Sequence, residues 1–328
     1  MRGYVIALFG GVLTVSCSVL TNFDALQCAG GACGDAGAPG EASTDAPADS
    51  GDSGSFDADA GSSGRCDKTK AFGAPQLVTE LDLTASTEFG ARLTADELTV
   101  FFTVADQSGI RIFSATRTTT SASFGTATFV STLSGTGSNS YPSLTGDGLA
   151  IFLESDRVAD AGFELFEAVR ATNSGPFGSL AQIPLLESPT FDGEPYVAPD
   201  GKTLYFVRGA TSAGPFNIFQ SAWSGAQFGQ PAMLGVVDTG QSAPVITANG
   251  LTLYYASDRA GGSGGPDVWK ATRKDVASLT FNAPVHVPEL DTASTDQPTW
   301  ISADECVIYL QSTRNAAELK IYRAIRPK

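Results

Sequence analysis

This sequence of 328 residues contains a single histidine, His286. A Ser-His-Asp triad requires a histidine between its two partners, and zinc sites commonly use more than one. His286 falls in an expected outer β-strand, where we interpret it as a strand residue. We therefore expect no metal and no cofactor, and the sequence disfavours triad hydrolases and histidine-based metalloenzymes.

Positive charge is also scarce. Lysine and arginine together number 20 against 35 aspartates and glutamates, which gives a net charge of −15 at pH 7. A nucleic-acid surface needs clustered lysines and arginines to neutralise phosphates, and the sequence contains no such cluster. We therefore expect no nucleic-acid partner.

Long apolar runs are confined to the N-terminal segment. Tyr4–Val15, which follows Arg2, is an apolar run of about 12 residues, too short for a bilayer span of about 20 residues. Ser16 and Cys17 come next, and "LTVSC" resembles the lipobox of bacterial lipoproteins, in which the cysteine is acylated, although Thr14 stands where leucine is usual. The alternative is an ordinary cleaved signal peptide. The lipobox predicts a lipid-anchored protein of the cell envelope, at the outer membrane, on its periplasmic or surface face.

Residues 18–70 are rich in glycine, alanine, serine, aspartate and proline. Such a composition cannot bury enough apolar surface to offset chain entropy, so we expect a disordered tether between a signal peptide at 1–17 and a folded domain at 71–328. The five cysteines fit an oxidising compartment. If Cys17 carries the lipid, Cys28 and Cys33 are close enough in sequence to pair, which leaves Cys66 and Cys306.

The folded region repeats itself about every 50 residues. Each copy has a turn with aspartate or asparagine, followed five residues later by an aromatic residue in a short apolar run typical of a buried strand. The five copies are "TADELTVFF" (94–102), "TGDGLAIFL" (145–153), "APDGKTLYF" (198–206), "TANGLTLYY" (247–255) and "SADECVIYL" (302–310). Two further strands follow each copy, one with an aromatic residue near its centre and one that opens with phenylalanine.

A repeat of this length with four short strands is typical of a β-propeller blade. The folded region begins with a fourth strand at "FGAPQLV" (72–78) and ends with a third strand, so the first of these must complete the last blade. We therefore predict an all-β, five-bladed β-propeller of four-stranded antiparallel blades, closed by the N-terminal strand pairing with the C-terminal blade. Cys66 and Cys306 then lie on the same face of the last blade, which predicts a disulfide across the closure.

The segments "APDGKTLYF" (198–206) and "SDRAGGSGGPDVW" (257–269) resemble the TolB-like, WD-type propeller repeat. The resemblance covers residues 72–328 and is weaker where "STR" (312–314) replaces SDR. TolB has six blades and a preceding α/β domain, whereas this sequence predicts five blades after a tether. The resemblance implies the propeller fold and a protein-binding platform of the cell envelope.

A ring of polar residues is predicted where the first strands begin, at the mouth of the central channel. We call these residues the collar; they lie eight positions before each turn residue and are Glu88, Asn139, Asp192, Gln241 and Asp296. One interpretation is a site for a protein, a sugar or a cation, and the other is that each residue hydrogen-bonds its own backbone before its strand. Tyr141 and Glu194 lie next to the collar and are not repeated, which makes them further candidates for ligand binding.

Two catalytic interpretations have less support. Collar carboxylates such as Asp192 would serve a glycoside hydrolase, an activity found among five-bladed propellers, but no motif of such a family surrounds them. The glycine-rich stretch 255–273 matches a nucleophile elbow at Ser263, yet a strand rather than the required helix follows it. We therefore expect a monomeric lipoprotein, attached to the membrane by its N-terminal lipid alone, that binds an envelope protein or a glycan through the face bearing the channel mouth. The glycoside hydrolase is the alternative.

Overall fold

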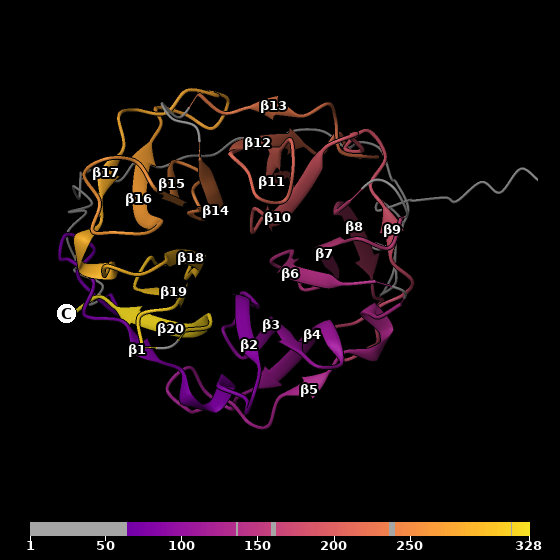
Figure 1. Cartoon of the computed structure of the whole chain (residues 1–328), viewed down its shortest axis with the longest axis horizontal. Helices are drawn as coiled ribbons and strands as arrows, with labels where there is room; N and C mark the ends of the chain where they lie inside the picture. Colours follow the sequence, from indigo (N-terminus) through magenta and orange to yellow (C-terminus); the bar gives the residue numbers. More distant parts are fainter. Residues whose placement is uncertain (1–63, 136, 159–161, 236–239, 316) are drawn as a thin grey trace, which may run out of the picture. The chain divides into compact units, whose positions relative to one another are not determined.

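The computed structural model describes residues 64–135, 137–158, 162–235, 240–315 and 317–328. In these residues the chain forms five antiparallel sheets of four strands each, arranged as the blades of a propeller (Figure 1). The predicted all-β, five-bladed fold is confirmed. No helix in these ranges is long and apolar enough to cross a membrane. The predicted signal peptide, Cys17, Cys28, Cys33 and the tether up to residue 63 lie outside the described residues.

Each blade runs from an inner first strand to an outer fourth strand (Figure 1). Blade 1 consists of β2 (Thr87–Leu93), β3 (Thr99–Asp106), β4 (Gly109–Thr116) and β5 (Thr128–Phe129); blade 2 of β6 (Asn139–Leu144), β7 (Ala150–Ser155), β8 (Glu164–Val169) and β9 (Ala181–Gln182). Blade 3 consists of β10 (Phe191–Val197), β11 (Thr203–Gly209), β12 (Phe216–Ala222) and β13 (Ala232–Met233); blade 4 of β14 (Gln241–Ile246), β15 (Thr252–Ser257), β16 (Asp267–Thr272) and β17 (Val285–His286). Blade 5 consists of β18 (Asp296–Ile301), β19 (Val307–Ser312), β20 (Lys320–Ile325) and β1 (Gln76–Leu77).

The turn between the first and second strands recurs because its side chains hydrogen-bond the local backbone. In blade 1 the Thr94 hydroxyl donates to Asp96 at 2.6 Å, and the same carboxylate accepts the backbone N–H of Leu98 at 2.9 Å. The same pattern joins Thr145 with Asp147 and Ser302 with Asp304. Aspartate and asparagine are favoured at this turn because their short side chains replace a backbone acceptor. The second strand that follows buries the repeated aromatic residue between neighbouring blades, as in Phe101, Tyr205 and Tyr309, none of which is more than 4% exposed.

An arginine at the end of the third strand joins the inner and outer parts of four blades. Its Nε donates to a carbonyl of the first hairpin, and its guanidinium lies over the phenylalanine that precedes the fourth strand, at 3.7–5.1 Å from the ring centroid. The pairs are Arg117 with Phe124, Arg170 with Phe177, Arg273 with Phe281 and Arg326 with Phe72. In blade 3, Trp223 takes this place and packs on Phe228 at 5.1 Å. Contact with this arginine, or with Trp223 in blade 3, therefore accounts for the phenylalanine that opens each fourth-strand segment.

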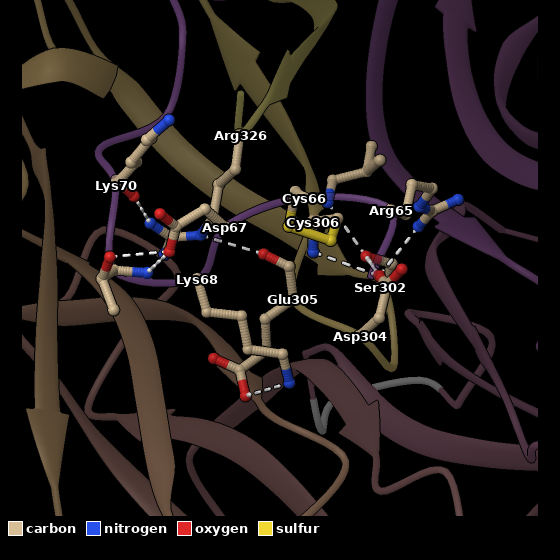
Figure 2. The surroundings of a disulfide bond; sticks show 12 residues. Arg65, Cys66, Asp67, Lys68, Lys70, Ser302, Asp304, Glu305, Cys306 and Arg326 are labelled. Carbon is tan, nitrogen blue, oxygen red and sulfur yellow. Dashed lines mark hydrogen bonds and ion pairs between the residues drawn. A yellow bond between two sulfur atoms is a disulfide. The ribbon is translucent and has the colours of Figure 1, made fainter. Parts of the chain in front are cut away.

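The ring closes where β1 pairs with β20, with Gln76 opposite Arg323 and Leu77 opposite Tyr322. The predicted disulfide is confirmed: Cys66 and Cys306 are bonded across a sequence separation of 240 residues, with their Cα atoms 5.6 Å apart (Figure 2). Arg65 donates to Glu97 of blade 1 at 2.7 Å and to Asp304 of blade 5 at 2.8 Å, so it bridges the two blades that meet at the closure. Residues 64–70, which we assigned to the tether, thus lie against the propeller.

We expect the double variant Cys66→Ser/Cys306→Ala to unfold more easily than the wild type, by on the order of 4 kcal/mol. The disulfide closes a very long loop, so its loss restores entropy to the unfolded chain. Urea unfolding of the two proteins under oxidising conditions measures the difference. The wild type in reducing agent is the matched control and should resemble the variant. Equal midpoints for oxidised wild type and variant would contradict the expectation.

Candidate functional site

The five first strands line the central channel, and each contains a bulge. In blade 3, for example, the pairing register of β10 with β11 shifts between Gly193 and Tyr196. In four blades the residue two positions after the collar residue has a positive φ: 62° at Gly90 and 51° at Tyr141, Glu194 and Ala243. Residues other than glycine occupy this left-handed region at a cost of roughly 1–2 kcal/mol. Three non-glycine residues in this conformation therefore require compensating contacts.

The compensation is a backbone hydrogen bond to the neighbouring blade. Thr103 of blade 1 accepts the N–H of Tyr141 at 3.0 Å, and Glu154 of blade 2 accepts the N–H of Glu194 at 2.8 Å. Gln311 of blade 5 accepts the N–H of Gly90 at 2.8 Å, and Glu194 accepts the N–H of Ala243. These bonds join four of the five neighbouring blade pairs around the channel.

The junction of blades 4 and 5 is the exception. The donor position in blade 5 is Pro298, which has no N–H, and the acceptor position in blade 4 is Ala256, which has no polar side chain. Donor and acceptor are missing together, so neither leaves a buried group unsatisfied. Here Gln297 donates to the Ser242 hydroxyl at 3.0 Å instead. The missing donor at Pro298 in blade 5 is therefore accompanied by a missing acceptor at Ala256 in blade 4.

The collar residues are all buried, and three of them are paired with a cation. Asp192 binds Arg208 through two hydrogen bonds of 2.6 and 2.9 Å. Asp296 accepts a bond of 2.6 Å from Arg314, and Glu88 accepts one of 2.8 Å from Lys320. Burial raises the pKa of Asp192 and of Glu88, while these cations act in the opposite direction. The carboxylates are therefore occupied by ion pairs within the propeller.

The collar also hydrogen-bonds the segments that precede the first strands. Asp296 accepts the backbone N–H of Thr292 at 2.6 Å, and Asp192 accepts the Ser188 hydroxyl at 2.7 Å. Asn139 accepts a bond of 2.6 Å from Arg157, and Gln241 is 1% exposed. The collar thus fixes the connections between blades, which is close to the local hydrogen-bonding role considered above.

Below the collar the channel holds a buried cluster of charged and aromatic residues. Glu154 and Glu194 are 5% and 8% exposed, and burial raises their pKa values to about 8 and about 7. Arg92 lies over the ring of Tyr196 at 4.7 Å, and burial lowers its pKa to about 10. Its Nε and Nη1 atoms have no hydrogen-bond partner. Arg92 was not among the candidates from the sequence, because only folding brings it next to Glu194.

A cavity of about 50 Å³ lies at the channel end farther from the collar, lined by Arg92, Tyr196, Trp300 and the ends of the first strands. A water molecule needs about 10–15 Å³ of such space, so the cavity has room for a few water molecules.

Partly exposed aromatic rings surround the collar end of the channel over blades 1–3. Phe89 and Tyr141 pack with their ring centroids 5.1 Å apart. Phe191 contacts Phe163 at 6.0 Å and Phe216 at 5.2 Å. We call these five residues the mouth aromatics. Tyr141 was a candidate from the sequence, whereas the phenylalanines were not, although Phe163 and Phe216 share one register, three residues before the repeated aromatic of the third strand.

Comparison with known proteins identifies the fold of the chain but not a family. No family model matches the sequence, and no curated protein matches it. TolB from Acinetobacter baumannii aligns over 73% of this chain and 54% of its own at 12% identity and a TM-score of 0.46, so this chain spans about half of that protein. A glycosyl hydrolase from Bacteroides ovatus aligns over 79% of this chain and 95% of its own at 13% identity and a TM-score of 0.52. A GH62 hydrolase in complex with xylotriose aligns over 78% and 97% at 10% identity and a TM-score of 0.52.

Likeness at such identities shows the fold alone. The chain is a five-bladed β-propeller. TolB structures are among its structural neighbours.

We expect Asp192→Ala to lower the free energy of unfolding by about 2–3 kcal/mol. Asp192 is fully buried, and its removal leaves Arg208 without its counter-charge. Urea unfolding measures the effect. Glu187→Ala, which removes an exposed carboxylate from the preceding connection, is the control and should change stability by less than about 0.5 kcal/mol. Equal stability for wild type and Asp192→Ala would contradict a structural role for this ion pair.

We expect stability to fall as pH rises from about 4.5 to about 8, and expect Glu154→Gln to reduce this slope. The folded chain holds the proton of Glu154 up to about pH 8, whereas the unfolded chain releases it near the ordinary value of 4.5. In this window the folded state holds the Glu154 proton that the unfolded state has released, so the contribution of Glu154 to stability is full below pH 4.5 and is lost toward pH 8, by at most ~1.4 kcal/mol per pH unit. Urea unfolding at pH 5, 6, 7 and 8 measures the slope, with exposed Glu318→Gln as control. An unchanged slope in Glu154→Gln would exclude Glu154 as a source of the pH dependence of stability.

Proposed function

We propose that this chain is a monomeric, lipid-anchored protein of the cell envelope, at the outer membrane, whose propeller binds a protein partner at the channel mouth. The observation that carries the proposal is the group of mouth aromatics, which stay partly exposed although each packs on another ring. Aromatic side chains are enriched in protein interfaces because they bury a large apolar area with little loss of side-chain entropy. The resemblance to TolB-like repeats supports the same function.

A protein partner fits this surface better than a glycan. Sugar recognition needs free hydrogen-bond donors and acceptors beside an apolar platform. The collar residues that would supply these groups are buried and hydrogen-bonded within the propeller; Asp192 and Asp296, for example, accept hydrogen bonds from arginines. The mouth aromatics stay partly exposed at this end of the channel. We therefore place a glycan second among ligand classes.

A glycoside hydrolase has less support still. Such an enzyme needs one protonated carboxylic acid and one ionised carboxylate that both reach the substrate. Asp192 and Asp296 are 0% exposed and paired with arginines. Glu194 has a raised pKa, but it is 8% exposed and accepts the N–H of Ala243. The likeness to solved glycosyl hydrolases shows the fold alone and adds nothing to the activity.

Membrane attachment is supported by two features of the sequence. "LTVSC" ends at Cys17, which would carry the lipid, and the low-complexity segment after it provides a flexible connection to the propeller. The disulfide between Cys66 and Cys306 suits an oxidising compartment such as the periplasm. The propeller would then be held near the membrane while its mouth meets a partner.

We expect Phe191→Ala to weaken capture of the protein partner at least tenfold. Phe191 contacts two other mouth aromatics, Phe163 and Phe216, so its removal takes away the ring that these two share. Immobilised wild type and variant are incubated with a solubilised envelope extract of the source bacterium, and bound polypeptides are quantified by mass spectrometry.

The matched control is Phe129→Ala, which removes a ring that is 39% exposed on outer strand β5. It should retain the partner. Capture of the same polypeptide by all three proteins would exclude the mouth as the site. Binding of a purified envelope polysaccharide in place of any polypeptide would assign the glycan, and cleavage of arabinan, xylan or fructan that is lost in Asp192→Asn would assign the hydrolase.

A further inference from the structure

Three side chains of metal-ligating type converge at the outer part of blade 4. Asp267 is the first residue of β16, His286 ends the short outer strand β17, and Asp291 follows the 3-10 turn Pro288–Leu290 on the way to blade 5. One donor atom from each lies within 4.8 Å of the other two. Segments separate in sequence thus bring one imidazole and two carboxylates to one point.

Each carboxylate uses one oxygen in the fold and leaves the other free. Oδ2 of Asp267 accepts the backbone N–H groups of Ser263 at 2.5 Å and Gly264 at 3.3 Å, and Oδ1 of Asp291 accepts that of Val268 at 2.8 Å. The remaining oxygens, Oδ1 of Asp267 and Oδ2 of Asp291, are buried without a hydrogen-bond partner. Carboxylates that bind metal ions are commonly oriented in this way, with one oxygen held by the protein.

The imidazole places a third donor atom at this point. Nε2 of His286 lies 2.7 Å from Oδ2 of Asp291, an ion pair when the ring is protonated, although the two atoms are not in hydrogen-bonding geometry. The ring packs on Trp269, with centroids 4.9 Å apart. Oδ1 of Asp267 has no such contact, and a buried polar atom left unsatisfied costs about 1–3 kcal/mol, so a ligand shared by the three atoms would satisfy it.

The local charge also favours a cation. Asp267 and Asp291 have the carboxylate of Asp296 nearby, but the cation beside it, Arg314, already donates to Asp296. A divalent ion would balance the negative charge of the two buried carboxylates.

We propose that Asp267, His286 and Asp291 bind a divalent transition-metal ion of the Zn²⁺ type. One imidazole nitrogen and two carboxylate oxygens form a donor set that Zn²⁺ accepts, whereas Ca²⁺ takes six to eight oxygen ligands and Mg²⁺ prefers oxygen. Water completes the coordination. The ion joins β16, β17 and the connection to blade 5, so it stabilises this junction independently of any partner at the mouth.

The glycine-rich loop before β16 fits around this site. A Cβ atom on Gly262 would lie 1.9 Å from Oδ2 of Asp267, and one on Gly264 would lie 2.5 Å from the carbonyl oxygen of Ala293. Glycine at these two positions lets the loop approach the carboxylate and donate its N–H groups. The glycines therefore serve the orientation of Asp267, and the Ser263 side chain takes no part.

Blade 2 provides a natural comparison. Glu164 begins its third strand, and Gln182 stands opposite Phe166 just as His286 stands opposite Trp269. Blade 2 thus carries a carboxylate but no imidazole at the equivalent positions. His286→Gln places in blade 4 the glutamine that blade 2 carries at the equivalent position, Gln182. Glu164→Gln removes the carboxylate of blade 2 that corresponds to Asp267.

The test uses the full chain in a Cys17→Ser/Cys28→Ser/Cys33→Ser background, so that thiolates outside the described residues do not bind the probe. The protein is freed of metal with a chelator, the chelator is removed, and ZnCl₂ is titrated by calorimetry while Tm is followed in parallel. We expect one Zn²⁺ per chain with a micromolar or lower Kd, together with a rise in Tm. His286→Gln and Asp267→Asn should each weaken binding at least tenfold and abolish the rise in Tm, whereas Glu164→Gln should bind as the wild type does.

Several outcomes would overturn the proposal. The site does not exist if the wild type shows no saturable Zn²⁺ binding, or if both blade 4 variants bind Zn²⁺ as tightly as the wild type. Saturable binding of CaCl₂ without binding of ZnCl₂ would refute the transition-metal assignment. The Tm of each metal-free variant shows whether it is folded, and two independent variants ensure that loss of one to misfolding leaves the other to decide.

Discussion

The structure depends on closure of the ring by β1, which pairs with β20 although the two strands lie at opposite ends of the folded region. Without this pairing, β20 would be an open edge strand on the outside of blade 5. The disulfide of Cys66 and the two ion pairs of Arg65 are placed at this same closure. Because the ring is closed, each first strand has a neighbour on both sides, which the bonds around the channel require.

The channel of this propeller is filled by the protein itself. Backbone N–H groups of the bulged first strands donate hydrogen bonds to Thr103, Glu154 and Gln311 of neighbouring blades. Arg92 and Tyr196 lie in the channel below them. The collar carboxylates, which the sequence offered as candidates for ligand binding, are therefore paired within the propeller. The accessible side chains are those at the mouth of the channel. This is why the mouth aromatics carry the proposed function in place of the collar.

Departures from the repeat are the most informative positions in this chain. Pro298 and Ala256 depart from the pattern together and leave the channel satisfied. In blade 4, His286 lies beside a carboxylate at the start of the third strand, Asp267, and a second one from the connection, Asp291. The glycine-rich stretch 255–273, which resembles several catalytic loops in sequence, is a hairpin of blade 4. Its one residue with a chemical role proposed above is Asp267, through the metal site.

The sequence by itself determined the five-bladed fold, the strand that closes it and the pairing of Cys66 with Cys306, because each follows from the period of the repeat and from counting strands. It also located the collar, since position within a repeat fixes which end of the channel a residue occupies. It could not determine what those residues contact. Whether Asp192 meets a ligand or Arg208, and whether His286 lies alone or beside two carboxylates, depends on side chains from other strands and connections. Only the tertiary structure brings those together, because burial and pairing arise from contacts between segments and leave no periodic trace in the chain.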